Sequence, residues 1–148
     1  MIKLLRSDEV FILKNLYKLN MYPILRDSLE KDLVTGKKTI LVYVEDSFVI
    51  GAVTLTKNEE KMHLSDLVVD EKYRRKGIGT SLVRESINYA EENNFDEITL
   101  NVREENDAAI NLYDNEEFMV KGVFQDREGK YFKMSKNLQN KKIRWYYG

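Results

Sequence analysis

The sequence predicts an α/β (α+β) domain in which a mixed, mostly antiparallel central sheet is flanked by about four helices, in the order β-α-α-β-β-β-α-β-α-β-β. Three observations predict this class. Apolar β-rich runs separated by short polar breaks follow one another over residues 39–69, which indicates neighbouring antiparallel strands. After Asp70 the apolar residues recur at helical spacing as far as Asn93. Beyond that helix, short strand-like runs alternate with one more short helical segment.

The first half of the chain is expected to hold four strands and two helices. The predicted strands are Ile2–Leu5, Thr39–Glu45, Phe48–Thr56 and Lys61–Val69, and Asp46-Ser47 is a hairpin signal between the second and the third. The first helix follows Asp8 and places apolar residues on one face: Val10, Leu13, Leu16 and Tyr17. A weaker helical pattern runs from Leu25 to Val34, and Gly36 closes it.

The second half begins with a long helix that starts close to Gly77. Ile98, Leu100 and Val102 alternate with polar residues, as the residues of a strand do. A short helix is expected from Asn106 to Asp114, with Asn106 as its cap. The last two strands, Phe118–Gln125 and Tyr131–Ser135, are expected to form a hairpin around Arg127-Glu128-Gly129.

Length and composition indicate one domain over residues 1–148 and exclude several classes of site. The chain has 24 Lys plus Arg against 25 Asp plus Glu, so we expect no nucleic-acid and no membrane partner, and any anion site must be local. It has no cysteine, which excludes disulfides and thiolate metal ligands. The N-terminal residues carry no apolar stretch long enough for a signal peptide or membrane helix, so a cytoplasmic location is expected.

The most informative segment runs from Val68 to Thr80, where a strand end, a cationic turn and a helix start follow one another. The first N–H groups of a helix have no internal partner and lie at the positive end of its dipole, so they bind anions. Gly77 and Gly79 would let a diphosphate approach those groups, with a local cluster of cations beside them: Arg74, Arg75 and Lys76. The alternative is that the glycines only shape a turn, but the strand before and the helix after favour phosphate binding.

In this segment the sequence resembles the GNAT acetyltransferase superfamily, whose cofactor motif is Arg or Gln, two residues, Gly, any residue, then Gly or Ala. Residues 74–79, Arg-Arg-Lys-Gly-Ile-Gly, match every specified position, and the resemblance extends to Leu138. It implies acetyl-CoA as cosubstrate and no metal, with the pantetheine arm held along the strand that ends at Val69. The cofactor-binding residues that it implies are Leu67, Val68, Val69, Arg74, Arg75, Lys76, Gly77, Ile78, Gly79, Thr80, Asn106 and Tyr113.

A second segment, residues 106–118, is similar to the family's second motif, in which an Asn opens a short helix and a Tyr closes it. Asn106 and Tyr113 fall on one helical face. The resemblance implies that Asn106 contacts the CoA arm, and that the hydroxyl of Tyr113 lies near the thioester sulfur, where a phenol of pKa about 10 supplies a proton. The alternative for Tyr113 is a core aromatic. Glu117 stands where the family usually has Gly, so this turn either avoids a positive φ or accepts strain.

The catalytic base is left open by the sequence. His63 is the only histidine and lies about where several family members carry a His or Glu that removes the amine proton through water. A strand histidine without a role is the alternative, as is water alone, and the weaker candidates are Asp66, Glu45 and Asp46. Asn101 stands where relatives that acetylate protein N-termini often carry a Glu, which makes that substrate class less favoured.

The resulting prediction is an N-acetyltransferase that transfers an acetyl group from acetyl-CoA to a primary amine of a small molecule or protein by direct attack on the thioester. One alternative is a catalytically weak CoA-binding sensor or regulatory module of the same fold, and another is an interaction protein that uses its tail. The resemblance implies that the acceptor site is shaped by residues 18–35 and 122–130. The tail, residues 139–148, alternates cations with aromatics and is expected to form an extra strand or a homodimer contact.

Overall fold

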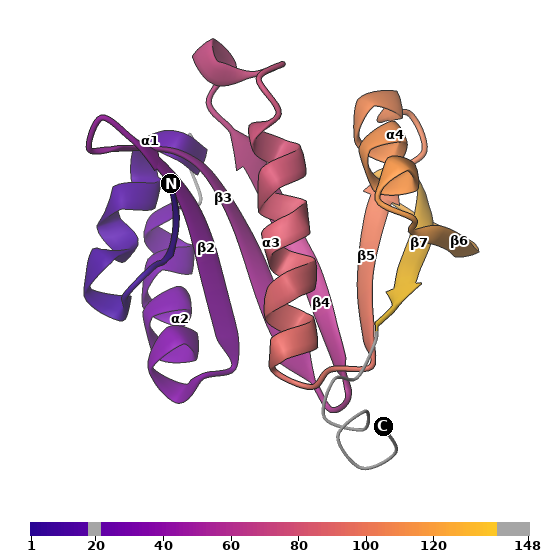
Figure 1. Cartoon of the computed structure of the whole chain (residues 1–148), viewed down its shortest axis with the longest axis horizontal. Coiled ribbons are helices and arrows are strands. Elements are labelled where there is room, and N and C mark those ends of the chain that lie inside the picture. The colour runs from indigo at the N-terminus through magenta and orange to yellow at the C-terminus, as the bar shows by residue number, and fades with distance from the viewer. Residues whose placement is uncertain (18–21, 139–148) are drawn as a thin grey trace.

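Seven strands, four α-helices and two short 3-10 helices make up the part of the chain that the computed structural model describes, which is residues 1–17 and 22–138 (Figure 1). In chain order these elements are β1 (Ile2–Leu4), the 3-10 helix η1 (Ser7–Ile12), α1 (Leu13–Tyr17), α2 (Tyr22–Thr35), β2 (Lys38–Glu45), β3 (Phe48–Asn58), β4 (Lys61–Val69), the 3-10 helix η2 (Glu71–Tyr73), α3 (Ile78–Glu92), β5 (Glu97–Arg103), α4 (Asp107–Asn115), β6 (Met119–Asp126) and β7 (Gly129–Asn137). The order of strands and α-helices confirms the prediction.

The strands form one sheet in the order β1-β2-β3-β4-β5-β7-β6. Every neighbouring pair is antiparallel except β4 and β5, which run parallel. A parallel pair needs a crossover connection, and α3 supplies it. The predicted mixed, mostly antiparallel sheet is therefore confirmed, and the one parallel pair lies at its centre.

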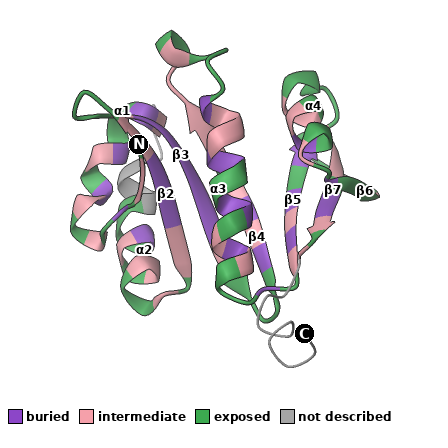
Figure 2. Cartoon of the chain, viewed as in Figure 1, coloured by how far each residue is buried: buried purple, intermediate pink, exposed green. Residues whose placement is uncertain are grey.

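Each face of the sheet carries its own apolar core. Figure 2 shows in purple the buried residues of the strands and helices. On one face, α3 and α4 pack on the strands through a larger cluster that includes Leu82, Val83, Ile98 and Phe118. On the other face, η1, α1 and α2 cover the first strands through a smaller cluster that includes Val10, Leu13 and Ile40. The helices α1 and α2 lie over the β1 to β4 side of the sheet (Figure 1).

The predicted hairpin between β2 and β3 is confirmed by its backbone. Asp46 has φ +50° and Ser47 has φ +68°, which are the two successive left-handed residues of a two-residue hairpin turn that suits the twist of the strands. Gly36, predicted to close the second helix, follows Thr35 with φ +79°. That is the left-handed conformation in which glycine commonly ends a helix.

The first predicted helix is split, which the sequence did not reveal. Residues Ser7–Ile12 form a 3-10 helix, and only Leu13–Tyr17 are α-helical. The tight first turn is held by Glu9, whose N–H donates to the carbonyl of Arg6 at 2.9 Å and whose carboxylate accepts from the N–H of Arg6 at 3.0 Å. A 3-10 helix has three residues per turn, so Val10 and Leu13 still lie on the same face, and both are buried.

Residues 18–21, part of the segment expected to shape the acceptor site, and the tail 139–148 lie outside the described residues. Within the described part, no helix is both long enough and apolar enough to cross a membrane.

Candidate active site

The two central strands separate partway along their length, and this opens the site. β4 pairs with β5 only from Lys61 to His63, opposite Glu97 to Thr99. Beyond that point the two strands diverge toward the end of the molecule where α4 lies (Figure 1). The far half of β4 therefore keeps its pairing with β3 but has an unpaired edge toward β5. This is the strand, ending at Val69, that by the family resemblance would hold the pantetheine arm.

A β-bulge lies in the unpaired half of β4. Thr54 of β3 pairs with Ser65 and Ala52 pairs with Val68, so two residues of β4, Asp66 and Leu67, oppose one of β3. Asp66 takes φ +53°, which is uncommon for a residue other than glycine. Bulges interrupt the ladder and are frequent beside active sites, where they re-aim backbone and side-chain groups. The sequence offered a weak signal for this feature in the polar pair Ser65-Asp66 within an apolar strand.

A cavity of about 560 Å³ lies between the unpaired half of β4, the turn that follows it and the start of α4. A pocket of this size falls in the usual range for small-molecule and cofactor sites. It is lined by Leu67, Val68, Val69, Tyr73, Arg74, Arg75, Gly77, Ile78, Gly79, Thr80, Asn106, Ala108, Ala109 and Leu112. Most of the predicted cofactor-binding residues are thus brought together around one space, although they come from segments about 30 residues apart.

The start of α3 leaves a set of amides free to bind an anion. The first backbone bond of the helix runs from the N–H of Ser81 to the carbonyl of Gly77 at 3.0 Å. Within the described residues, no hydrogen bond uses the N–H groups of residues 77–80, and no side chain caps the helix. Because these N–H groups line the cavity wall at the positive end of a 15-residue helix, they are suited to a phosphate group.

The two glycines of the turn have different roles. Gly77 takes φ +79°, and a Cβ built on it would meet nothing within 4 Å, so it provides the left-handed turn and open space in front of the amides. A Cβ on Gly79 would come within 3.3 Å of Cδ1 of Leu112. Gly79 therefore allows α3 to approach α4, a packing role that the sequence did not suggest. Arg75 also takes a left-handed conformation, at φ +65°.

The three predicted cations are not equivalent. Arg74 and Arg75 line the cavity, and the Nε of Arg74 donates to the carbonyl of Val69 at 3.3 Å. Lys76 is not among the lining residues, and its Nζ lies 5.3 Å from the centre of the Tyr73 ring. The side chains of all three are exposed, so their charges act at the rim of the cavity.

Helix α4 is held at both ends by local bonds. At its start, Oδ1 of Asn106 accepts from the N–H of Ala109 at 3.1 Å, which confirms the predicted cap, and Asn106 lines the cavity. At its end, the N–H of Phe118 donates to the carbonyl of Tyr113 at 2.9 Å, and the N–H of Glu117 donates to Asp114 at 2.9 Å. This pair of bonds is the Schellman motif.

Glu117 occupies the left-handed position of that motif with φ +69°, so the turn accepts the strain that glycine would avoid. The motif also places Tyr113 against Phe118, with the ring centres 5.7 Å apart in an edge-to-face arrangement. Tyr113 is only 6% exposed and is not among the residues that line the cavity. Burial raises the pKa of Tyr113 to about 12.

His63 lies at the last paired position before β4 and β5 separate. Its Nδ1 is 2.8 Å from Oγ1 of Thr99, its partner across the two strands. Burial lowers the pKa of His63, and the carboxylate of Asp66 partly opposes this effect. His63 does not line the 560 Å³ cavity, and it points to the sheet face opposite α3, because Met62 and Leu64 on either side of it pack under α3.

The weaker candidates are exposed. Asp66 stands on the bulge, and Glu45 and Asp46 stand in the hairpin between β2 and β3. None of these three lines the cavity. Asn101 is exposed on the face of β5 opposite its buried neighbours Leu100 and Val102. Among the described residues, no three His, Cys, Asp or Glu side chains gather in a way that could hold a metal ion.

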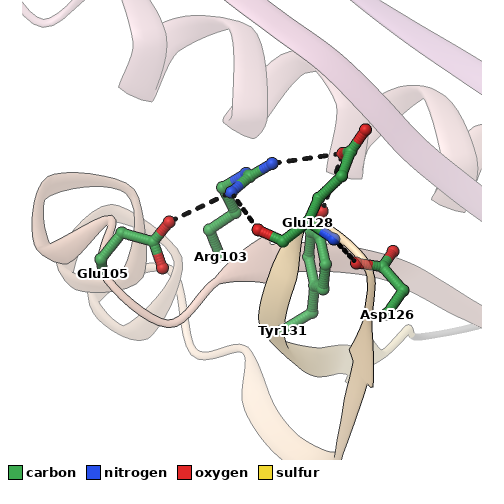
Figure 3. A network of polar contacts seen from close by, with 5 residues as sticks. All are labelled: Arg103, Glu105, Asp126, Glu128 and Tyr131. Carbon is green, nitrogen blue, oxygen red and sulfur yellow. Dashed lines mark hydrogen bonds and ion pairs between the residues drawn. The ribbon is translucent and has the colours of Figure 1, made fainter.

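A polar network that the sequence did not reveal ties the last hairpin to β5 (Figure 3). The guanidinium of Arg103 donates to the carbonyl of Glu128 at 3.0 Å, to the carboxylate of Glu128 at 3.2 Å and to the carboxylate of Glu105 at 3.2 Å. Tyr131, which pairs with Arg103, donates to Glu128 at 3.3 Å and stacks on Phe124 at 4.8 Å. One side chain therefore joins the hairpin turn to the loop that precedes Asn106.

Comparison with known proteins identifies relatives of this chain. A sequence model of the acetyltransferase (GNAT) family matches residues 7–118. Streptothricin acetyltransferase A of Bacillus subtilis (strain 168) is 33% identical over 89 residues, which cover 60% of this chain and 51% of that protein. The probable N-acetyltransferase san of Drosophila melanogaster is 36% identical over 110 residues, which cover 68% of this chain and 59% of that protein. The matched part of this chain spans about half to three fifths of the length of these curated relatives.

Solved structures share the fold at low sequence identity. A ribosomal-protein-alanine N-acetyltransferase from Brucella melitensis superposes with a TM-score of 0.82 over 93% of this chain and 99% of that chain, at 20% identity. The PaiA N-acetyltransferase from Thermoplasma acidophilum, solved in complex with coenzyme A, gives a TM-score of 0.74 over 93% of this chain and 99% of that chain, at 21% identity. These likenesses confirm the predicted fold class.

Proposed function

The chain belongs to the acetyltransferase (GNAT) family, and we propose that it transfers an acetyl group from acetyl-CoA to a primary amine of a small molecule or protein. The observation that carries this proposal is the free set of amides at residues 77–80, which face a cavity whose second wall is the unpaired edge of β4. A diphosphate fits the amides, and an extended amide-containing arm fits the strand edge.

The residues present fit each part of the proposed cosubstrate. The amides of residues 77–80 would bind the diphosphate, with Arg74 and Arg75 adding charge at the rim. The unpaired edge of Leu67–Val69 would bind the pantetheine amides, and Asn106 closes the opposite side. Acetyl-CoA supplies an acetyl group that is already activated as a thioester.

The chemistry requires the protein to bind an oxyanion and to move two protons. As the amine nitrogen forms its bond to the carbonyl carbon, the carbon–sulfur bond breaks, the amine loses one proton and the sulfur gains one. A backbone N–H of the bulged segment after Asp66 would stabilise the negative charge on the carbonyl oxygen. Backbone donors fixed by the fold need no rearrangement during the reaction, which makes them effective in this role.

Tyr113 is the proposed acid. Because burial raises its pKa to about 12, the phenol keeps its proton at any physiological pH and stays available as a donor. The Schellman motif at the end of α4 fixes its backbone, and the Phe118 ring fixes the orientation of its own ring.

His63 is the proposed base, acting through water. It lies three residues before the bulge, a distance of about 10 Å along a strand, so direct contact with an amine at the bulge is excluded. A lowered pKa keeps the imidazole neutral near pH 7, the state in which it accepts a proton.

The acceptor is proposed as a primary amine without a narrower class. Relatives named for streptothricin and for protein N-alpha groups both match this chain, so small-molecule and protein acceptors are both retained. Asn101 stands where relatives that acetylate protein N-termini often carry a Glu, so protein N-termini are the less favoured of these acceptors.

Thiol release from acetyl-CoA over a panel of amines tests the reaction, with Tyr113→Phe as the chemical control. We expect turnover with at least one amine and a fall in kcat of about 10²-fold or more in Tyr113→Phe. Tight CoA binding without turnover on any amine would instead support a CoA-binding regulatory module. That second candidate is favoured by one observation, the exclusion of Tyr113 from the cavity lining.

A matched pair of glycine variants tests the diphosphate site. Gly77 and Gly36 both have φ +79°, and a Cβ on either would meet nothing within 4 Å. Gly77→Ala and Gly36→Ala should therefore lose similar stability, about 1 kcal/mol. Only Gly77→Ala should weaken CoA binding in calorimetry, by about tenfold or more, because its methyl group enters the space in front of the amides. Equal CoA affinity in the two variants would contradict the proposed site.

A further inference from the structure

A row of side chains crosses the sheet at the point where β4 and β5 begin to separate. The strand pairings place these residues side by side in one line over six strands: Lys38, Thr56, His63, Thr99, Ser135 and Met119. Paired residues point to the same face, so the four middle members present hydroxyl groups and one imidazole in sequence on the face opposite α3.

Ser135 is the unusual member of this row. It is 4% exposed, and its Oγ is fully buried without a hydrogen-bond partner among the described residues. A buried hydroxyl that makes no hydrogen bond destabilises the folded state, so such groups are uncommon in folded proteins. Ser135 lies directly opposite Thr99, with the Cβ atoms of such a pair about 5 Å apart, so a rotation about χ1 of Ser135 brings the two hydroxyls into hydrogen-bonding range.

The contact between His63 and Thr99 has two arrangements of protons. In one, Thr99 donates to Nδ1, which leaves the imidazole proton on Nε2 and removes Nε2 as a base. In the other, Nδ1–H donates to Oγ1 of Thr99 at 2.8 Å, and Nε2 carries the free lone pair. The second arrangement leaves the proton of Thr99 in need of an acceptor, and Ser135 is the hydroxyl placed to accept it.

We propose that Ser135 is a positioning residue which, through Thr99, holds His63 with its proton on Nδ1 and its lone pair on Nε2. Ser135 accepts the hydroxyl proton of Thr99, so Thr99 presents its oxygen to Nδ1. The inference rests on the proposed acetyl transfer for its purpose, because the Nε2 lone pair is what the base requires. The principle is that of other catalytic histidines, in which the group bound to one ring nitrogen sets the protonation of the other.

Among the residues that the structure describes, none supplies a competing acceptor for Nδ1 of His63. Asp66, the carboxylate whose charge acts on His63, lies beyond Ser65 on the bulge and makes no hydrogen bond to the ring. From β3 the facing residue is Thr56, from β5 it is Thr99, and from β2 the row ends in Lys38, which is 3.7 Å from Asp32.

The test is the tautomer of the imidazole, measured in the free protein by two-bond ¹H–¹⁵N NMR. His63 is the only histidine, so its ring signals need no assignment. At a pH of about 8, above the ordinary histidine pKa, the wild type should show the proton on Nδ1. In Ser135→Ala, Thr99 has no acceptor of its own, so it should donate to Nδ1, and the imidazole proton should move to Nε2.

Three further variants separate this role from a merely structural one. Thr99→Val should also lose the Nδ1–H tautomer, and Thr99→Ser, which keeps the hydroxyl, should retain it. Thr56→Val removes a hydroxyl on the other side of His63 in the same row and should leave the tautomer unchanged. A wild-type ring protonated on Nε2, or an unchanged spectrum in Ser135→Ala, would overturn the proposal whether or not any amine is acetylated.

Steady-state kinetics with an acceptor amine that the wild type acetylates provide the second readout. Ser135→Ala should lower kcat about tenfold or more and leave KM for acetyl-CoA unchanged, because Ser135 lies outside the cavity. An unchanged kcat alongside a shifted tautomer would overturn the role of Ser135 in the reaction. Absence of turnover in the wild type would count against acetyl transfer itself, and the NMR result would still decide how the three side chains share their protons.

Discussion

Glu117 stores backbone strain at the end of α4. Its φ of +69° costs a residue other than glycine about 1 kcal/mol, yet the Schellman motif requires it. The same motif sets the position of Tyr113, whose carbonyl accepts from Phe118 and whose ring packs on it. The strain is therefore retained at a residue that positions the proposed acid.

Glu117→Gly should stabilise the protein. Glycine adopts a positive φ without strain, and its greater freedom in the unfolded chain offsets only part of this gain, so we expect about 0.5 kcal/mol and a rise in Tm of about 1–2 °C. The variant also loses the contact of Glu117 with Lys136 at 3.3 Å, which as a surface pair contributes little. Thermal unfolding measures the change.

Asn94→Gly is the matched control for that change. Asn94 also follows a helix end and has φ +65°, but asparagine tolerates this conformation better than glutamate does. Its replacement should therefore raise Tm less than Glu117→Gly. An equal or larger gain at position 94 would show that strain at Glu117 is not the cause.

His63 should make the stability of the protein fall in mild acid. Burial lowers its pKa in the folded state, so below the ordinary value of about 6.5 the unfolded chain binds the proton more tightly. The stability that depends on neutral His63 is present above about pH 6.5 and is lost as pH falls through the lower pKa of the folded state. Urea unfolding from about pH 7.5 to pH 5 should show a larger loss for the wild type than for His63→Gln.

Asp66→Asn provides the control for this pH effect. The Asp66 carboxylate raises the pKa of His63 against the larger effect of burial. Removing its charge should lower that pKa further, so the loss of stability in acid should become larger than in the wild type. A smaller loss in Asp66→Asn would contradict the assignment of the acid effect to His63.

At the scale of elements, β6 and β7 depend on Arg103 for the position of their turn. This side chain bonds the backbone and the carboxylate of Glu128 as well as Glu105, so three segments are joined by one guanidinium (Figure 3). Arg103→Ala should increase hydrogen exchange at the turn, residues 126–130, by about fivefold, equivalent to about 1 kcal/mol of local opening free energy.

Arg127→Ala serves as the control for the hairpin. Arg127 stands in the same turn and is exposed, and no hydrogen bond or ion pair joins its side chain to a described residue. Its replacement should leave exchange at residues 126–130 within about twofold of the wild type. Equal protection in Arg103→Ala and Arg127→Ala would indicate that strand pairing alone holds the turn.

At the scale of the whole molecule, ligand binding should couple to folding. A ligand that binds only the folded state at 100 times its Kd stabilises it by about 2.7 kcal/mol, which for a chain of 148 residues raises Tm by about 5–10 °C. CoA should produce such a shift. Pantetheine, which lacks the diphosphate, should produce a much smaller one at the same concentration.

The difference between the Tm shifts with CoA and with pantetheine measures what the amides at the start of α3 contribute to binding. If pantetheine shifted Tm as much as CoA, the diphosphate would contribute nothing, and the free N–H groups of residues 77–80 would have no part in binding. Gly77→Ala should reduce the shift with CoA and leave the shift with pantetheine unchanged.

Local chemistry made much of this molecule predictable from its sequence. The helix caps at Gly77 and Asn106, the turn at Asp46-Ser47 and the order of the elements all depend on residues within a few positions of one another. Periodicity, glycine conformation and capping act over the same short range, so a single sequence contains them. The cofactor motif belongs to this group, because its strand, turn and helix are consecutive.

The features that the sequence did not predict were decided by pairing between distant strands. No residue near His63 shows that β4 and β5 separate there, that Asp66 forms a bulge or that Ser135 stands beside Thr99. Tyr113 shares a helical face with Asn106, yet it packs in the core while Asn106 lines the cavity, because Phe118 returns beneath the helix. The sequence by itself determined the elements and the anion-binding turn, whereas the register of the sheet, a sum of many long-range contacts, decided which side chains meet.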